Sequence, residues 1–185
     1  MKRSMTLIGF GLLAVAPALS GDSRREKMDQ YTSIEVAAPR NKVGDVLEEK
    51  AIDDLEERIV AAINESKVLV ASENRDLKFP RKDPDDDTKV MFMGSGKEED
   101  KKTIVLFTEL ITFNKGSRAK RYLIGGGTGR AELRGNCYLV DKSTGKQLYN
   151  FQSFGETNWG LAGGGSDKTL KGFASRVVGF LKGKY

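Results

Sequence analysis

Apolar residues recur along the first half of the chain in a helical pattern. The residues concerned fall at spacings that place them on one face of a helix: Leu47, Ile52, Leu55, Ile59 and Ile63. Asp45 and Glu48 have the spacing of a capping box at the start of this pattern, which ends near Lys67. We therefore expect an amphipathic helix that begins at about Asp45.

A second helical pattern lies close to the end of the chain. Ser166 or Asp167 is its candidate cap, and its apolar stripe consists of Leu170, Phe173, Ala174, Val177 and Leu181. Gly172 and Gly179 each cost such a helix up to about 1 kcal/mol relative to alanine. We expect packing to hold this helix, and another backbone to approach it closely.

Runs of β-branched and apolar residues predict strands at 31–38, 89–93 and 103–113. A similar run at 68–71 is either a further strand or the frayed end of the first helix. Residues 131–154 predict a hairpin, closed by turn residues at 141–145. In its first strand one side carries Ala131, Leu133, Gly135, Cys137 and Leu139, and the other carries Glu132, Arg134, Asn136 and Tyr138. We expect one apolar face toward a core and one polar face toward solvent. The predicted fold is α+β, with a mostly antiparallel sheet of about five strands packed against two helices.

The N-terminus has the pattern of a secretory signal peptide. Lys2 and Arg3 precede an apolar run of about 13 residues, shorter than the ~20 needed to span a membrane as a helix. Ala16 and Ala18 have the spacing that a signal peptidase reads. We predict a cleaved signal peptide at 1–20 and a single domain at 21–185, exported to the bacterial periplasm, without a transmembrane segment in the mature chain. A retained anchor or a buried core helix is the alternative.

Charge and cysteine content narrow the possible functions. Removal of Lys2 and Arg3 lowers the formal charge from +5 to +3, too mild a basic excess to indicate nucleic-acid binding. Cys137 is the sole cysteine, so no intramolecular disulfide can form, and its apolar neighbours indicate a small buried residue. The chain contains no histidine, which removes the usual general base and most zinc sites.

The glycine-rich stretch 124–130 invites a nucleotide-binding interpretation. It lacks the Gly-Lys-Ser/Thr ending of a phosphate-binding loop, and Arg130 or Glu132 stands where a dinucleotide fingerprint needs its last glycine. A strand follows, so no helix N-terminus is available for a phosphate. Gly125, Gly127 and Gly129 alternate in step with the inward-facing residues of the next strand. If the strand extends back through them, its inward face begins without side chains, and we expect a bend or bulge there.

The acidic run 83–87 invites a calcium interpretation, which fails. An EF-hand loop beginning at Asp83 needs glycine at its sixth position and glutamate at its twelfth, where Thr88 and Gly94 stand. We interpret the run as a solvated loop and predict no metal and no cofactor.

Residues 120–133 read Lys-Arg-Tyr-Leu-Ile-Gly-Gly-Gly-Thr-Gly-Arg-Ala-Glu-Leu, and Asp141, Thr144 and Gly145 form an Asp-x-x-Thr-Gly turn. This combination resembles the signature of a bacterial envelope family, domain of unknown function 4410, over roughly residues 103–182. The resemblance implies export and a compact α+β domain. It implies no established activity and lends no catalytic residues. Many members look like lipoproteins, whereas this chain lacks the cysteine for a lipid anchor.

Three function classes remain. The favoured one is a non-catalytic module that binds or assembles with an envelope protein or cell-wall component. The second is a small-ligand or anion carrier that uses the glycine-rich loops. The third is an enzyme, for which no spacing of residues provides support. The candidate binding surface consists of Lys115, Arg118, Lys120, Arg121, Arg130 and Trp159. The plainer interpretation of the basic residues is a solvated loop, and that of Trp159 is a hydrophobic plug under its loop.

Overall fold

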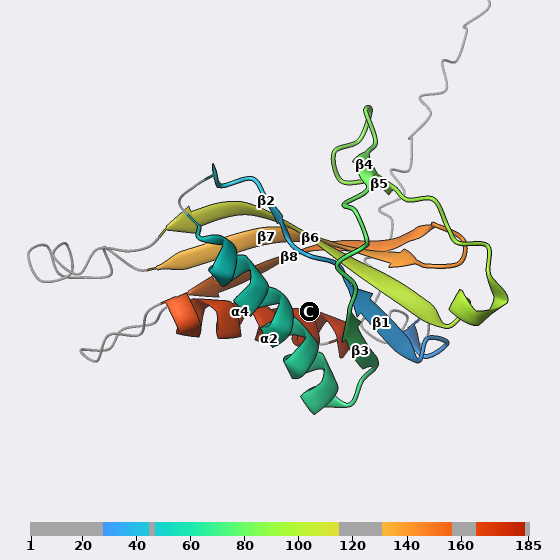
Figure 1. The fold of residues 1–185 in the computed structure, drawn as a ribbon, viewed down its shortest axis with the longest axis horizontal. Helices are drawn as coiled ribbons and strands as arrows, with labels where there is room; N and C mark the ends of the chain where they lie inside the picture. Colours follow the sequence, from blue (N-terminus) through green and yellow to red (C-terminus); the bar gives the residue numbers. More distant parts are fainter. Residues whose placement is uncertain (1–27, 45–46, 115–130, 157–165, 184–185) are drawn as a thin grey trace, which may run out of the picture.

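The structure is a computed structural model that describes residues 28–44, 47–114, 131–156 and 166–183. Its centre is a six-stranded sheet in the order β3-β1-β6-β7-β8, with β2 also paired to β6 (Figure 1). The strands are β1 (Ser33–Val36), β2 (Arg40–Asn41), β3 (Val70–Glu73), β6 (Thr103–Asn114), β7 (Glu132–Asp141) and β8 (Gln147–Glu156). A 3-10 turn, η2 (Glu98–Asp100), precedes β6.

The predicted α+β class is confirmed, but the sheet is mixed rather than mostly antiparallel. β7 is antiparallel to both of its neighbours, β6 and β8, whereas β1 runs parallel to both β3 and β6, and β2 runs parallel to β6. For β1 and β3 the cause is the helix between them, because a crossover through a helix returns the chain to the same end of the sheet. The predicted hairpin is confirmed as β7 and β8.

Both helices cover the same face of the sheet, where they contact one another (Figure 1). Helix α2 spans Glu49–Ser66 and ends at Lys67, whose φ of 56° is left-handed. Its first residue lies four positions after the predicted start, and Asp45 lies outside the described residues. Helix α4 spans Ser166–Leu181. The predicted apolar stripes form the core here, with Leu55, Ile59, Ile63, Leu170, Phe173, Ala174, Val177 and Leu181 all buried.

Glycine brings α4 directly onto β8. A Cβ atom added at Gly155 would lie 1.8 Å from the carbonyl oxygen of Thr169, and one at Gly172 would lie 3.2 Å from the Cα atom of Gly155. The expected approach of a backbone to Gly172 is therefore confirmed, and its partner is strand β8. The bare strand entrance expected at Gly125, Gly127 and Gly129 lies outside the described residues.

A segment at residues 77–93, here called the arm, folds over the opposite face of the sheet. It contains a small antiparallel pair, β4 (Arg81–Lys82) and β5 (Val90–Met91). Phe79 packs edge-on against Phe107 and Tyr138, with ring centroids 5.9 Å apart in both cases. The hairpin face expected to be polar is thus buried in part, because the arm covers Tyr138 and Val140.

Cys137 is fully buried and free, as its neighbours indicated, and burial raises the pKa of its thiol to about 12.

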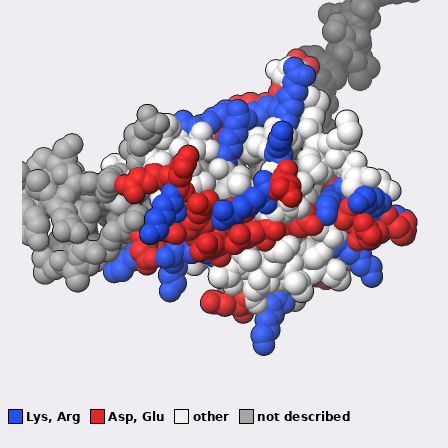
Figure 2. All heavy atoms as spheres, viewed as in Figure 1, with Lys and Arg blue, Asp and Glu red and all other residues white. Residues whose placement is uncertain are grey.

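None of the helices in the described part of the chain is both long enough and apolar enough to cross a membrane. Acidic and basic side chains are interspersed over the face seen in Figure 2, rather than segregated by sign.

Candidate functional site

The face of β6, β7 and β8 that the helices leave uncovered, here called the open face, carries polar side chains beside the arm. Alternate residues of a strand point to opposite faces, so Asn136 shares this face with the arm-covered Tyr138. Register places Asn150 opposite Tyr138 and Gln152 opposite Asn136. The open face therefore presents amide groups on two adjacent strands.

A buried carboxylate lies at the centre of the open face. Glu109 of β6 is 1% exposed, yet it meets three cations from other elements. Lys42 Nζ lies 2.9 Å from its Oε1, Lys82 Nζ lies 2.8 Å from its Oε2, and Arg40 Nη1 lies 3.7 Å away. Burial alone would raise the pKa of Glu109, but hydrogen bonds from Lys82 and Lys42 outweigh it, so the pKa lies below its ordinary value. Because Lys82 belongs to β4, this cluster ties the arm to the sheet.

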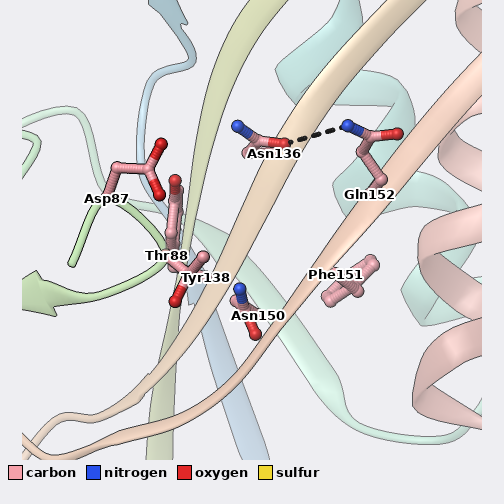
Figure 3. A pocket seen from close by; sticks show the side chains of 7 residues that line it. All are labelled: Asp87, Thr88, Asn136, Tyr138, Asn150, Phe151 and Gln152. Carbon is pink, nitrogen blue, oxygen red and sulfur yellow. Dashed lines mark hydrogen bonds between the residues drawn. The ribbon is translucent and has the colours of Figure 1, made fainter.

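A groove of about 240 Å³ lies between the arm and the strands β7 and β8 (Figure 3). Its lining residues are Asp87, Thr88, Asn136, Tyr138, Asn150, Phe151 and Gln152. Asp87 and Thr88 approach from the arm, and the amides come from the hairpin. The groove is therefore formed by segments that lie far apart in the sequence.

Hydrogen bonds fix both sides of the groove. The Gln152 Nε2 donates to Asn136 Oδ1 at 3.4 Å across the two strands. On the arm side, Gln147 accepts from the backbone N–H of Val90 at 2.7 Å and donates to the carbonyl of Thr88 at 3.0 Å. The arm thus has a second attachment to β8 beside the Glu109 cluster, and the groove is formed before any ligand arrives.

The acidic run leads up to Asp87 and orders its own turn. Asp86 accepts hydrogen bonds from the backbone N–H and the hydroxyl of Thr88 and pairs with Lys89 at 2.8 Å. The hydrogen bond from Lys89 is the main cause that lowers the pKa of Asp86 to about 2. Within the described segments, no group of three acidic, cysteine or histidine residues is arranged to hold a metal ion.

The site residues predicted from the sequence all lie outside the described residues. They are Lys115, Arg118, Lys120, Arg121, Arg130 and Trp159, together with the glycine motif at Gly125, Gly127 and Gly129. What sequence reasoning missed is the open face. One signal was available, since Glu109 is a charged residue inside the otherwise apolar run 103–113.

The part of the chain that carries the open face is similar to a known protein family. The model of the family described as "Domain of unknown function (DUF4410)" matches residues 88–159. The predicted resemblance is confirmed. The matched segment contains β6, β7 and β8, and with them Glu109 and the three amide residues of the groove. No curated protein matches the chain.

Among solved structures, a variant PelC dodecamer from Paraburkholderia phytofirmans is similar with a TM-score of 0.51 and 10% identity, covering 82% of this chain and 90% of that one. Lipoprotein GNA1162 from Neisseria meningitidis has a TM-score of 0.43 and 14% identity, covering 81% and 94%. A hypothetical protein from Chlamydia trachomatis has a TM-score of 0.46 and 11% identity, covering 83% and 98%. At such identities the first similarity shows a shared fold.

Proposed function

We propose that the protein is an exported envelope protein that works as a non-catalytic binding or assembly module, and that the open face is its binding surface. The observation that carries the proposal is the preformed polar groove. One face of the sheet is covered by two helices, while the other holds convergent polar groups beside a fixed arm. A concave site with a few placed polar groups is the usual form of a binding site.

Export is supported by the signal-peptide pattern at 1–20. A binding role is supported by how the charged groups of the open face are used. Glu109 is held by Lys42 and Lys82, which keeps it ionised, so it lacks the raised pKa of a general acid. Assembly with further copies of the chain is supported by the fold shared with a protein that forms a dodecamer.

The basic residues Arg118, Lys120 and Arg121 remain a proposed second contact region, for an acidic protein, an anionic polymer or a lipid headgroup. In the sequence they lie between β6 and β7, two of the strands that carry the open face. This proposal and that of the open face are separable by mutation.

The test is co-purification of a tagged, exported protein with envelope components after cross-linking. Three forms are compared: the unaltered chain, the double variant Asn136→Ala/Gln152→Ala, and the triple variant Arg118→Glu/Lys120→Glu/Arg121→Glu. We expect an envelope component to co-purify with the unaltered chain and to be lost in the double variant. Failure of the unaltered chain to retain any component, or full retention by the double variant, would contradict the open-face proposal. Full retention by the triple variant would contradict only the basic contact region.

A further inference from the structure

We propose that the groove between the arm and the hairpin binds a neutral, hydroxyl-rich ring, the sugar unit of a glycan. This inference rests on the proposed function and names the ligand class of the same face. It is drawn from the chemistry of the lining residues, their charge and the way they are held.

The polar groups that line the groove match hydroxyl groups. Amide side chains both donate and accept hydrogen bonds, and a sugar hydroxyl does the same. The bond from Gln152 to Asn136 occupies one donor and one acceptor. The Asn136 amino group and the Gln152 carbonyl oxygen retain further hydrogen-bonding capacity, and Asn150 adds another exposed amide beside them. The Asp87 carboxylate faces them from the arm, next to Thr88, whose hydroxyl already donates to Asp86.

The charge of the lining excludes an anionic ligand. No residue among those that line the groove is basic, and the one charged side chain is the carboxylate of Asp87. The described cations that adjoin the lining already have acidic partners: Lys82, beside the Tyr138 ring, pairs with Glu109, Lys89 pairs with Asp86, and Arg134 pairs with Glu132. A phosphate or carboxylate ligand would therefore meet repulsion without a compensating partner.

The lining also excludes an apolar ligand. Tyr138 is 1% exposed, so its ring forms the floor and offers almost no free surface. The ring of Phe151 stacks on Phe180 of α4, with centroids 3.8 Å apart, on the opposite face of the sheet. An apolar group in the groove would strip water from amides and a carboxylate without satisfying them, which costs free energy.

Size and rigidity agree with one sugar ring. The groove volume of about 240 Å³ lies below the roughly 300–1,000 Å³ of sites for drug-sized ligands. Gln147 and the Glu109 cluster hold the arm on the sheet, so little ordering is required when a ligand binds. Longer chains would contact the groove through a single unit.

The experiment follows the side-chain amide resonances of Asn136, Asn150 and Gln152 in the isotope-labelled mature protein by nuclear magnetic resonance. The probes are three neutral oligosaccharides, cellohexaose, maltohexaose and chitohexaose, together with hyaluronan as a polyanionic glycan and a neutral peptide. We expect at least one neutral oligosaccharide to shift these amide signals at millimolar concentration. In Asn136→Ala/Gln152→Ala the affinity should fall by about tenfold or more, since two hydrogen bonds are lost. The matched control Gln30→Ala removes an exposed amide outside the groove and should bind as the unaltered chain does.

Shifts caused only by hyaluronan or only by the peptide would overturn the proposal, as would no shift with any of the three neutral oligosaccharides. Binding that survives in the double variant would also overturn it. If these probes fail while the double variant still loses its envelope component in the co-purification, the glycan inference fails and the proposed function stands. If both experiments fail, the open face is not a binding surface.

Discussion

The two faces of the sheet are built from different chemistry. The helix-covered face is apolar, and glycine brings the α4 backbone against β8 at Gly155. The open face carries a carboxylate ringed by cations and a groove of amides beside the arm. The first face excludes water and gains stability from burial, whereas the second retains polar groups that a binding surface needs. The part of the open face that we propose to contact a partner is the amide groove, whereas the apolar cluster under the arm and the Glu109 cluster also hold the fold.

The same contrast appears in two buried carboxylates. Glu109, on the open face, has three cations around one carboxylate. Glu56 of α2 is fully buried and shares the single guanidinium of Arg75 with Asp53 and Glu73, at 3.5–3.6 Å. Burial is the main cause that raises the pKa of Glu56, against the opposing effect of Arg75. The surroundings of Glu109 thus stabilise its ionised form, whereas those of Glu56 disfavour the ionised form.

The largest effect is expected at the contact between α4 and β8. Gly155→Ala places a methyl group where the Thr169 carbonyl lies, so backbone must move, and we expect a loss of about 3 kcal/mol in the free energy of unfolding. Urea denaturation measures it. Gly172→Ala is the matched control, since its milder crowding is offset by the ~1 kcal/mol that alanine gains in a helix. Equal losses in the two variants would show that the close contact is not a determinant of stability.

A smaller loss is expected at Glu109. Glu109→Gln leaves Lys42 and Lys82 without their anion, and because both retain access to water we expect a cost of about 2 kcal/mol at neutral pH. Since the pKa of Glu109 is lowered in the folded state, its contribution is present above the ordinary glutamate pKa and is lost as pH falls through the folded value. Denaturation from neutral pH to pH 3 should therefore show a shallower acid dependence in the variant. An unchanged dependence would contradict the assignment.

Glu56 should respond in the opposite direction. Its raised pKa means that its contribution is present below the ordinary glutamate pKa and is lost as pH rises through the folded value. Glu56→Gln, which resembles the protonated form, should therefore be neutral or stabilising by up to about 1 kcal/mol at pH 7. Thermal or urea denaturation at pH 7 checks this. A loss as large as that of Glu109→Gln would show that the two carboxylates are equivalent.

The smallest effect on stability is expected in the groove. Asn136→Ala/Gln152→Ala removes partly exposed and exposed side chains, so we expect a change within about 0.5 kcal/mol in the free energy of unfolding. A loss above 2 kcal/mol would assign these amides to the fold rather than to binding.

Local patterns predicted the elements of the helix-covered face. The period of apolar residues gave α2 and α4, and strict alternation gave the inward side of β7. Pairing direction could not be read in this way, because β1 is parallel to β3 only as a result of the crossover through α2. The burial of Tyr138 depends on the arm folding back over the hairpin, which no alternation within the hairpin reports.

The candidate site was harder to predict for the same reason. Glu109 is a charge within an apolar strand, a signal that the sequence analysis did not use, and its partners Arg40 and Lys82 come from segments distant in sequence. Asn136 was assigned to the polar side of the predicted hairpin, yet a polar side alone does not reveal a groove. The arm supplies its second wall, and Gln147 fixes that wall through backbone contacts that the sequence pattern does not encode.

The proposal that the open face, and not the helix-covered side, contacts a partner is tested most directly by site-specific cross-linking in living cells. A photo-reactive amino acid replaces Gln152 on the open face or, in a second protein, Glu57 on the exposed side of α2. Both positions are exposed, so both proteins should fold and be exported. We predict that position 152 cross-links to an envelope component and that position 57 does not. Cross-linking from position 57 with none from position 152 would contradict the account.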